Sequence, residues 1–592
     1  MMKHISVIKI TGYTGFFLTL AYLFFFLRQL DLSLTYYWQQ TIPLSFGEAL
    51  QYPGDISELL GERFLELLTR PFTGFIAVVL LVSVIFFSLY IPFRRSSSSP
   101  VFYPLLLVAL APYILLLVHY RLPVGLVISV PAGILLGGLQ SLYSPANRVA
   151  RFIYWFIAGI IVYLIAGTPG LLVLIQVIII QVFLSGKYMD FISILTIIAI
   201  PVIYLPVNLS YTARLAYLGS FLISRYNELP LIFWFCLSAP LLFLLVFSGL
   251  EFIKSRFNIK RLSLLSGAGM ILVLAALVFS TQISVNKQER NVLKIFQAGF
   301  RNDGAEVIRL ERDQLFIDKM MQFEINRALY KTGHLLDSLF NYPQQFAEKG
   351  IFLEDKTSSR VALHISNFYY DLGFALEARH WATEAQMVLM RHPVVLKNLV
   401  MTYIAVGNTE IAQKYLRILS GSWLYRDWSN KILEMIESNT SGDNAAINSF
   451  RINNPKTDYF AETSNPTRKL MNFYSSNPDN KMAFEFLVAS YLLQHQVGNV
   501  LIHLPGFRKF GYEKIQRAVE EAMLIYLART QSDKLSIPGY PISQETMNDF
   551  MDFNKRMLSS ERKSEQMRNV AKYKNTYWYY ILFSSPYNAV KK

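Results

Sequence analysis

Long apolar blocks fill the first half of the chain and are absent from the second half. Between residues 10 and 283 these blocks follow one another, separated by short polar segments. A helix needs about 20 predominantly apolar residues to cross the hydrocarbon core of a bilayer. The pattern predicts a multispan membrane domain over residues 1–283 and a soluble domain over residues 284–592.

We place about nine membrane-spanning helices in the first domain. Two of them, 152–166 and 171–184, are separated only by Gly-Thr-Pro-Gly, so they form either two short spans or one broken or re-entrant pair. We favour an odd number of spans. The predicted segments are Ile10–Leu27, Phe72–Phe93, Val101–His119, Val124–Tyr143, Phe152–Ala166, Leu171–Leu184, Phe191–Val207, Leu231–Leu250 and Leu264–Ile283.

Basic residues mark one side of the predicted membrane domain. Arg94, Arg148 and the run from Lys254 to Arg261 fall in loops on the same side, which is cytoplasmic by the positive-inside rule. The amino terminus is then cytoplasmic and the C-terminal domain lies outside. Cys236 is the only cysteine, so an exported domain folds without a disulfide, which favours a bacterial inner membrane with a periplasmic domain.

Composition agrees with a membrane protein, since 53% of residues are hydrophobic and only 16% are charged. The sequence pI of about 9.4 would also suit a nucleic-acid-binding protein. However, the basic excess of the first half lies in loops between spans, and the second half interleaves both signs of charge. The expected partners are the lipid bilayer and other envelope proteins, not nucleic acid.

The second half shows helical spacing of apolar residues and a repeat with an offset of 34 residues. The glycines relieve a turn between paired helices, the alanines allow close helix approach, and the aromatic residues fill the space between neighbouring hairpins. The matching pairs are Tyr369 with Tyr403, Gly373 with Gly407, Ala378 with Ala412, and Trp381 with Tyr415.

This offset is the period of tetratricopeptide repeats, and residues 369–419 resemble about one and a half to two such repeats. A third, looser hairpin is centred on Gly333. The alternative is a chance alignment of two hairpins in a generic helical array. Both interpretations predict an all-α chain with a polytopic helical membrane domain and a soluble α-helical, repeat-like domain.

Residues 326–345 and 477–526 are similar to segments of an uncharacterised family of bacterial multispan membrane proteins. The outer loop that begins Tyr52-Pro53-Gly54-Asp55 is similar too. The resemblance covers nearly the whole chain, and it implies no activity.

Motifs for metal, phosphate or nucleophilic chemistry are not found in the sequence. The eight histidines include no pair at the spacing that puts two imidazoles on one helix face. We therefore predict no metal and no cofactor, and we lean against an enzyme. Within the spans, Gln176 is interpreted as a possible link between helices, and Gly133-x-x-x-Gly137 as a contact within the chain more than between chains.

An acidic residue in the first outer loop supports an alternative function. This organisation resembles membrane glycosyltransferases of the C superfamily, in which a carboxylate of that loop acts as a general base or metal ligand and the donor is a lipid-linked sugar. The resemblance implies a catalytic role for Asp55, with Glu58. It also implies that Arg214 or Arg225 holds the lipid phosphate.

A structural interpretation explains the same loop without a substrate. The spacing of Asp55 and Glu58 is that of a capping box at the start of a helix. An amphipathic helix near residues 55–70 would follow, with one apolar stripe and with Glu62, Arg63 and Glu66 mostly on the solvent side. The apolar residues of the stripe are Ile56, Leu59, Leu60, Phe64, Leu67 and Leu68.

Our leading hypothesis is an inner-membrane protein whose periplasmic helical-repeat domain binds other proteins. It would be a subunit or scaffold of an envelope-biogenesis or export complex, because helical repeats form long surfaces suited to peptides or partner helices. The contact residues are expected at polar positions of the first helix of each pair. The glycosyltransferase is the second hypothesis.

Overall fold

The computed structural model consists of helices joined by short connections, and no strand occurs among the residues that it describes. This confirms the all-helical class. The described residues are 2–91, 101–121, 124–140, 147–185, 191–204, 231–257, 262–311, 317–353, 358–438, 444–457, 465–530 and 541–588, with the single positions 99, 145, 212, 216, 217 and 440.

The chain forms two compact units, which we describe separately. The first comprises Met1–Lys287 with Gly421–Leu424, and the second comprises Gln288–Ser420 and Tyr425–Lys592. The first unit contains α1 (Met2–Leu30), α2 (Ser33–Gln39), η1 (Glu48–Leu50), α3 (Asp55–Leu67), α4 (Pro71–Tyr90), α5 (Phe102–Leu116), α6 (Val124–Gln140), α7 (Arg148–Ser185), α8 (Phe191–Tyr204), α10 (Leu231–Phe257) and α11 (Leu262–Ser284).

Five helices of the first unit, among the described residues, are long and apolar enough to cross a membrane. Helices α5, α6 and α8 are apolar but shorter, and at about 1.5 Å per residue they extend less than the roughly 30 Å hydrocarbon core. The five helices are Val7–Leu30, Pro71–Tyr90, Arg148–Phe183, Leu231–Leu250 and Ser266–Ser284. They cover six of the nine predicted spans, because Arg148–Phe183 contains two of them, and the number nine stays a prediction.

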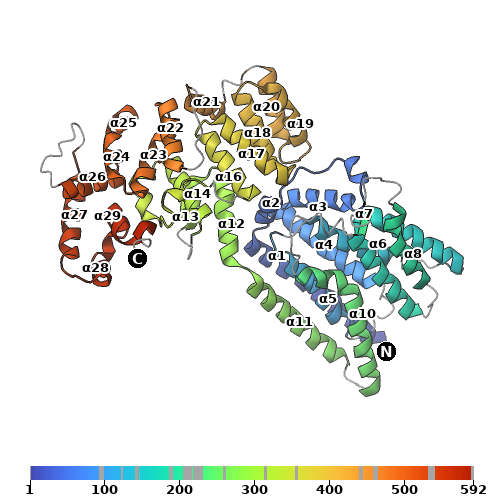
Figure 1. Ribbon diagram of the computed structural model, residues 1–592. Helices are drawn as coiled ribbons and strands as arrows, with labels where there is room; N and C mark the ends of the chain where they lie inside the picture. Colours follow the sequence, from blue (N-terminus) through green and yellow to red (C-terminus); the bar gives the residue numbers. More distant parts are fainter. Residues whose placement is uncertain are drawn as a thin grey trace. The chain divides into compact units, whose positions relative to one another are not determined.

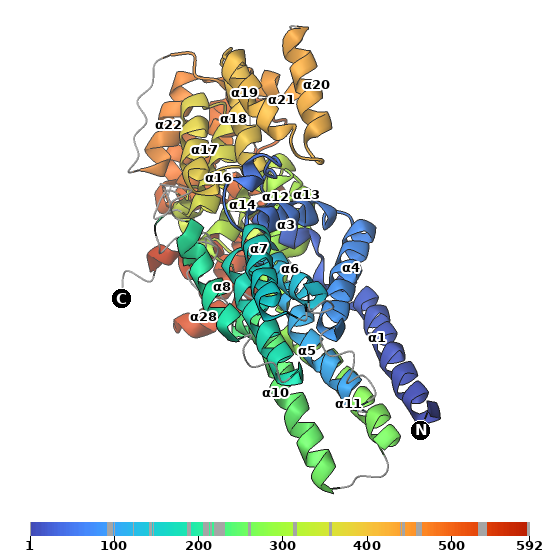
Figure 2. The same ribbon diagram turned by 90° about the vertical axis from the view of Figure 1, so that its right-hand side faces the viewer.

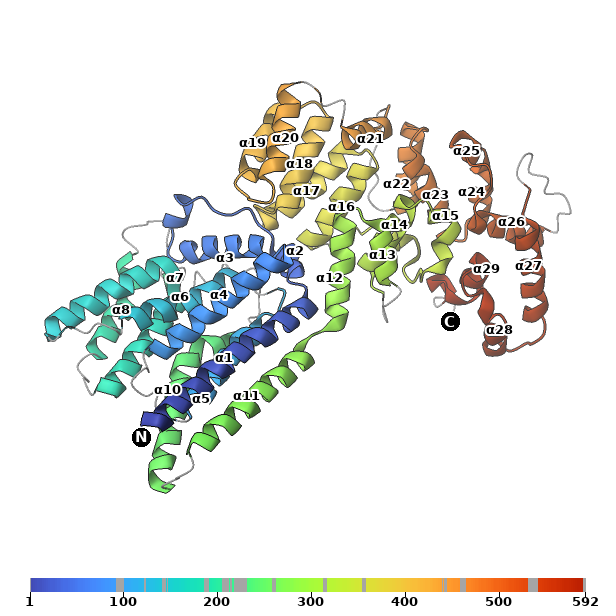
Figure 3. The same ribbon diagram turned by 180° about the vertical axis from the view of Figure 1, so that it is seen from behind.

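Helix α5 is the centre of the bundle, where it packs against α4, α10 and α11. Figure 3 shows these helices running alongside one another, with α1 next to α11. Their facing sides are closely packed aromatic and aliphatic residues, as where Phe16 of α1 stacks on Phe86 of α4 with ring centroids 4.0 Å apart. The core of this unit is thus built from the apolar sequence blocks themselves.

Helix α7 reverses direction at Gly167. The backbone there has φ 62° and ψ −157°, which is not helical and which glycine adopts readily. A Cβ atom on Gly170 would lie only 3.0 Å from Cγ1 of Val162. Residues eight apart in a straight helix are separated by about 12 Å, so the two halves of α7 form a tight hairpin. The two predicted segments are therefore antiparallel neighbours, as both two short spans and a re-entrant pair require.

Small residues bring α6 into backbone contact with the α7 hairpin. A Cβ atom on Gly133 would lie 2.8 Å from the Cα atom of Gly170, and one on Gly137 would lie 3.1 Å from Cγ2 of Val177. At the first contact the backbones approach through glycine on both helices, and at the second Gly137 makes room for the Val177 side chain. The Gly133-x-x-x-Gly137 motif therefore serves packing within the chain.

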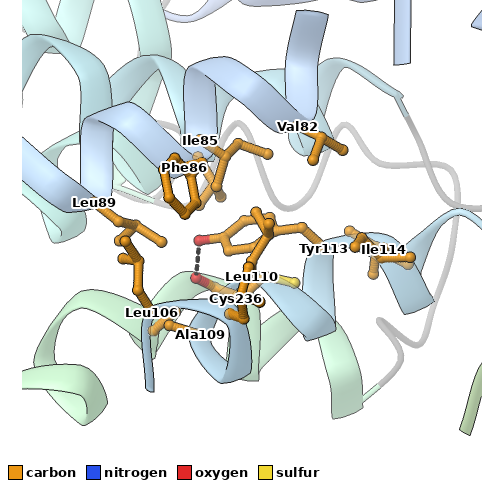
Figure 4. Close-up of a cluster of buried hydrophobic side chains, with 14 of the residues drawn as sticks. Val82, Ile85, Phe86, Leu89, Leu106, Ala109, Leu110, Tyr113, Ile114 and Cys236 are labelled. Carbon is orange, nitrogen blue, oxygen red and sulfur yellow. Dashed lines mark hydrogen bonds between the residues drawn. The ribbon is translucent and has the colours of Figure 1, made fainter. Parts of the chain in front are cut away.

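A proline in α10 leaves a backbone carbonyl for a side chain of α5. Pro240 has no N–H, so the Cys236 carbonyl loses its helical donor. The Tyr113 hydroxyl donates to this carbonyl at 2.5 Å. Figure 4 shows the bond among buried side chains of α4 and α5. Cys236 itself is a buried free thiol.

Gln176 of α7 makes two hydrogen bonds to the backbone of α10 near Pro240. Its Nε2 donates to the Leu237 carbonyl at 2.9 Å, and its Oε1 accepts from the N–H of Leu241 at 3.2 Å. In an unbroken helix these two backbone groups would bond to each other. The amide thus links two helices, as its position within an apolar block suggested.

The second unit is an array of short helices (Figure 1). They are α12 (Lys287–Phe300), α13 (Gly304–Glu311), α14 (Lys319–Lys331), α15 (Leu335–Ser338), η5 (Leu339–Asn341), η6 (Ala347–Gly350), α16 (Ser359–Asp371), α17 (Ala375–Leu389), α18 (Pro393–Ala405), α19 (Thr409–Leu419), α20 (Arg426–Glu437), α21 (Ala445–Asn453), α22 (Pro466–Ser476), α23 (Lys481–Leu493), α24 (Val497–Ile502), α25 (Leu504–Lys509), α26 (Arg517–Thr530), α27 (Gln544–Met557), α28 (Lys563–Asn569), η8 (Ala571–Tyr573), α29 (Tyr577–Tyr579), η9 (Tyr580–Ser584) and η10 (Pro586–Asn588).

Among the described residues, one turn recurs after four helices of equal length in this unit, and it also follows α12 and α25. Helices α14, α16, α18 and α23 each have 13 residues, and the second residue after each has a positive φ. The N–H of the next residue then donates to the carbonyl five residues before it, at 2.8 to 2.9 Å, as in a Schellman cap. The residues with positive φ are Gly333, Gly373, Gly407 and His495.

Candidate functional site

Helix α3 is fixed to the reversal of α7 by backbone groups that the reversal leaves unpaired. Pro169 has no N–H to offer the Ile165 carbonyl, and the Ser57 hydroxyl donates to it at 2.8 Å. The N–H of Gly54 donates to the Leu164 carbonyl at 3.0 Å. Gly54 and Ser57 at the start of α3 therefore supply the hydrogen-bond donors that α7 lacks at its reversal, and these bonds hold α3 against the turn at Gly167.

A glycine pair brings α3 equally close to α6. A Cβ atom on Gly61 would lie 2.7 Å from the backbone nitrogen of Gly125, and one on Gly125 would lie 3.0 Å from Oε2 of Glu58. The buried face of α3 therefore follows its small residues, and Leu60 of the predicted apolar stripe is 49% exposed. The other five residues of the predicted stripe are partly or fully buried, so both close backbone approach and side-chain hydrophobicity decide which face of α3 is buried.

Asp55 lies in the first turn of α3 but does not cap it. The cap position is taken by Gly54, whose φ of 95° suits glycine, and no side chain accepts from the first-turn amides. The predicted capping box is therefore wrong. Burial, with a smaller contribution from the nearby Glu58 carboxylate, raises the pKa of Asp55 to about 7.

Two further carboxylates of α3 are buried, although the helical pattern placed them on the solvent side. Glu62 accepts from the N–H of Leu44 at 2.8 Å. Glu66 accepts from the hydroxyl of Ser422 at 2.5 Å and from the N–H of Trp423 at 3.0 Å, both in the four-residue segment that belongs to this unit. Each carboxylate is buried because it satisfies backbone donors.

Asp55 is the carboxyl group of this site that has the chemistry of a proton acceptor. A carboxyl group with a pKa near neutrality can take and release a proton at physiological pH, which suits a general base. Arg214 and Arg225 lie outside the described residues. Within the described part of the chain, no three His, Cys, Asp or Glu side chains are grouped to hold a metal ion.

The residues of the 34-residue repeat occupy equivalent places in two successive hairpins, α16–α17 and α18–α19 (Figure 2). Both glycines have φ near 80°, and both alanines are fully buried between paired helices. Among the aromatic residues, Tyr369 is buried, Trp381 is half-buried, and Tyr403 and Tyr415 stack at 6.1 Å. The glycines are Gly373 and Gly407, and the alanines are Ala378 and Ala412.

The third hairpin expected around Gly333 has a short second helix. Gly333 has φ 76° and follows α14, but α15 contains only four residues. A related turn at His495, which has φ 61° after α23, was not predicted. Histidine adopts this conformation less readily than glycine, so the turn carries no glycine to mark it.

The surface formed by the first helices α16 and α18 is covered by another helix of the same unit. Helix α21 packs against both of them. The Phe450 ring stacks on Tyr370 with centroids 5.1 Å apart, and Asn453 Nδ2 donates to the Asp371 carbonyl at 3.1 Å. Some positions on these first helices are therefore covered by α21, and the expected contact residues are among the remaining ones.

A buried ionic cluster joins α14 to α16, and sequence reasoning did not find it. Arg327 donates to Asp371 at 2.8 Å and lies 3.5 Å from Glu324. Nδ1 of His364 lies 2.5 Å from Oε1 of Glu324. Burial by itself raises the pKa of Glu324, but His364 and Arg327 outweigh it and hold that pKa below its ordinary value. From the sequence, only the three-residue spacing of Glu324 and Arg327 on one helix could indicate an ion pair, and their partners on α16 could not be identified.

Comparison with known proteins gives a family without a known activity. The model of a family described as "Family of unknown function (DUF6057)" matches residues 3–584. No curated protein matches the chain, and no solved structure matches it. The expected resemblance to a family of unknown function over nearly the whole chain is confirmed.

Proposed function

The chain belongs to the DUF6057 family, whose function is unknown, and we propose from its own geometry that it is a membrane-anchored scaffold. In this proposal the apolar helices of the first unit fix the protein in a bacterial inner membrane. The helical array of the second unit binds other envelope proteins, as a subunit or scaffold of an envelope-biogenesis or export complex.

The observation that carries the proposal is the recurrence of one helix length and one turn. Four 13-residue helices end in the same cap, and two of them start 34 residues apart and are followed by second helices. Repeated hairpins of this kind are the unit of tetratricopeptide-like arrays. Such arrays present extended surfaces for peptides and helices.

The proposed sidedness follows from charge in the connections between apolar helices. Basic residues near Arg148 and in the run from Lys254 to Arg261 favour the cytoplasm. The amino terminus is then cytoplasmic and the second unit periplasmic. Reporter fusions at both termini test this, and a cytoplasmic signal from the C-terminal fusion contradicts it.

Purification of the full-length protein from its native membrane in mild detergent tests the scaffold. We expect stoichiometric partners that survive a salt wash, because apolar helix contacts are insensitive to ionic strength. Identification by mass spectrometry gives the partner. The proposal is contradicted if the chain is recovered without partners while its circular dichroism spectrum shows that its helices are intact.

A second candidate function is glycosyl transfer from a lipid-linked donor, with Asp55 as the general base. One observation favours it: Asp55 has no capping role, and burial beside Glu58 raises its pKa to about 7. Asp55 lies at the start of α3, next to the reversal of α7. In this second proposal its carboxylate contacts the substrate at the membrane surface. Arg214 and Arg225 remain the proposed phosphate ligands of this alternative.

The Asp55→Asn variant separates the structural and catalytic roles by pH. The folded pKa of about 7 exceeds the ordinary value of 3.8, so the folded state binds more protons and its stabilisation is lost as pH rises through about 7. We expect the melting temperature of the wild type in detergent to fall between about pH 5 and pH 8. The variant should show a smaller fall, since Glu521, whose pKa burial also raises to about 7, still contributes, and it should melt higher than the wild type at about pH 8.

The same variant tests transferase activity. Under the second function it loses transfer from a lipid-linked sugar at every pH while it stays folded. Equal pH dependence of melting in variant and wild type contradicts the raised pKa. Full activity of a stable variant contradicts catalysis by Asp55.

A further inference from the structure

The position of α21 differs from what the repeat spacing predicts. Helix α20 begins where a third first helix is expected, about 34 residues after α18, and a second helix should follow and pack on it. Helix α21 follows at the expected distance but lies on α16 and α18 instead. Leu433 and Ile436 on α20 are left partly exposed.

Two apolar side chains hold α21 in this place. Ile447 and Phe450 are three residues apart, so they project from one face of the helix, and they are 0% and 2% exposed. Ser449, Arg451 and Ile452 are exposed, and Ile452 is 64% exposed. An apolar pair at this spacing is how a short amphipathic helix binds in a groove.

The carboxyl end of α21 is fixed through its backbone. Asn480 Nδ2 donates to the Asn453 carbonyl at 3.0 Å, and Asn477 Nδ2 donates to the Ile452 carbonyl at 2.8 Å. Both asparagines are fully buried. At the amino end, the Asn444 side chain accepts from the N–H of Ile447 at 3.2 Å and caps the helix. The carboxyl end of α21 is thus a fixed point, and Ile447 and Phe450 are the apolar anchors of the helix.

We propose that the groove formed by α16 and α18 is a helix-binding surface and that α21 is its intramolecular occupant. The partner is an amphipathic helix of another protein with an aliphatic residue and, three positions later, an aromatic residue that stacks on Tyr370. This rests on the proposed scaffold function and names its contact site. Release of α21 about its fixed end opens the groove, and the unpaired face of α20 receives the released helix.

Cysteine labelling of the full-length protein in detergent tests the release. Ile447→Cys and Ile404→Cys replace the same residue type at two positions that are 0% and 1% exposed, the second within α18. The native thiol at Cys236 is replaced by alanine in both. We expect a maleimide to label Ile447→Cys at least tenfold faster than Ile404→Cys. Equal slow rates show that α21 is a permanent part of the core and overturn the proposal.

Binding of a fluorescent peptide of residues 444–454 tests the groove itself. The Ile447→Ala and Phe450→Ala double variant, whose own helix no longer fills the groove, should bind it at least tenfold more tightly than the wild type. The matched control, Ile452→Ala, alters an exposed residue of the same helix and should bind like the wild type.

A peptide with both anchors replaced by alanine should not bind. Failure of the double variant to bind the intact peptide, while its melting curve shows a folded second unit, overturns the proposal. The labelling and peptide-binding experiments do not need a natural partner. Their results therefore test the groove even if the purification finds no partner and the scaffold proposal fails.

Discussion

Replacing Arg327 with alanine is expected to destabilise the second unit by about 3–5 kcal/mol. The change leaves the carboxylates of Glu324 and Asp371 buried without their shared cation, and each is costly to keep charged in a low-dielectric environment. Burial alone raises the pKa of Asp371, and Arg327 with Lys331 more than reverses this effect. Thermal unfolding in detergent, followed by circular dichroism, measures the loss.

The control for this prediction is an exposed ion pair of the same unit with the same spacing. Arg309 contacts Glu306 three residues before it, and their side chains are 63% and 37% exposed. The Arg309→Ala variant should change stability by less than about 1 kcal/mol, because water replaces the partner. Similar losses in both variants would show that the buried cluster has no special role.

Replacing Gly61 with alanine is expected to destabilise the first unit by about 1–3 kcal/mol, since the added methyl group overpacks a backbone contact. The Cβ atom would lie 2.7 Å from the nitrogen of Gly125, and neither backbone can yield as a side chain can. The shift separates α3 from α6 and also strains the bonds from Gly54 and Ser57 to α7. Melting of the purified protein measures the effect.

Gly249→Ala is the matched control for Gly61→Ala. Gly249 also lies within a helix, α10, and has no atom within 4 Å of the position of an added Cβ. Alanine favours the helix over glycine by about 1 kcal/mol, so this variant should be as stable as the wild type or more stable. An equal loss in both variants would contradict the prediction, because helix propensity favours alanine at both positions and only Gly61 has the close contact.

The sequence carried the features that depend on local spacing. Gly373 and Gly407 mark two turns because the same backbone conformation is needed after each first helix. The Gly-Thr-Pro-Gly segment likewise indicated that α7 does not continue straight, and Gly167 is where it turns. His495 forms the same turn without glycine, so no local rule identified it.

Features that depend on distant partners were not predictable from sequence. Glu66 appeared to face solvent because helical periodicity alone places it there, but its donors are 356 and 357 residues away in the chain. Asp55 appeared to be a cap because of its spacing to Glu58, yet the preceding Gly54 starts the helix. The site at α3 is decided by contacts with α6 and α7 that a single sequence does not contain.

The hairpin within α7 has a consequence for sidedness. A segment that turns back on itself ends on the side from which it started, whether or not its two halves cross the whole bilayer. It therefore adds no net crossing. The compartment assigned to residues after Ser185 is the same for a full pair of spans and for a partial re-entrant loop, so this ambiguity does not carry over to the rest of the chain.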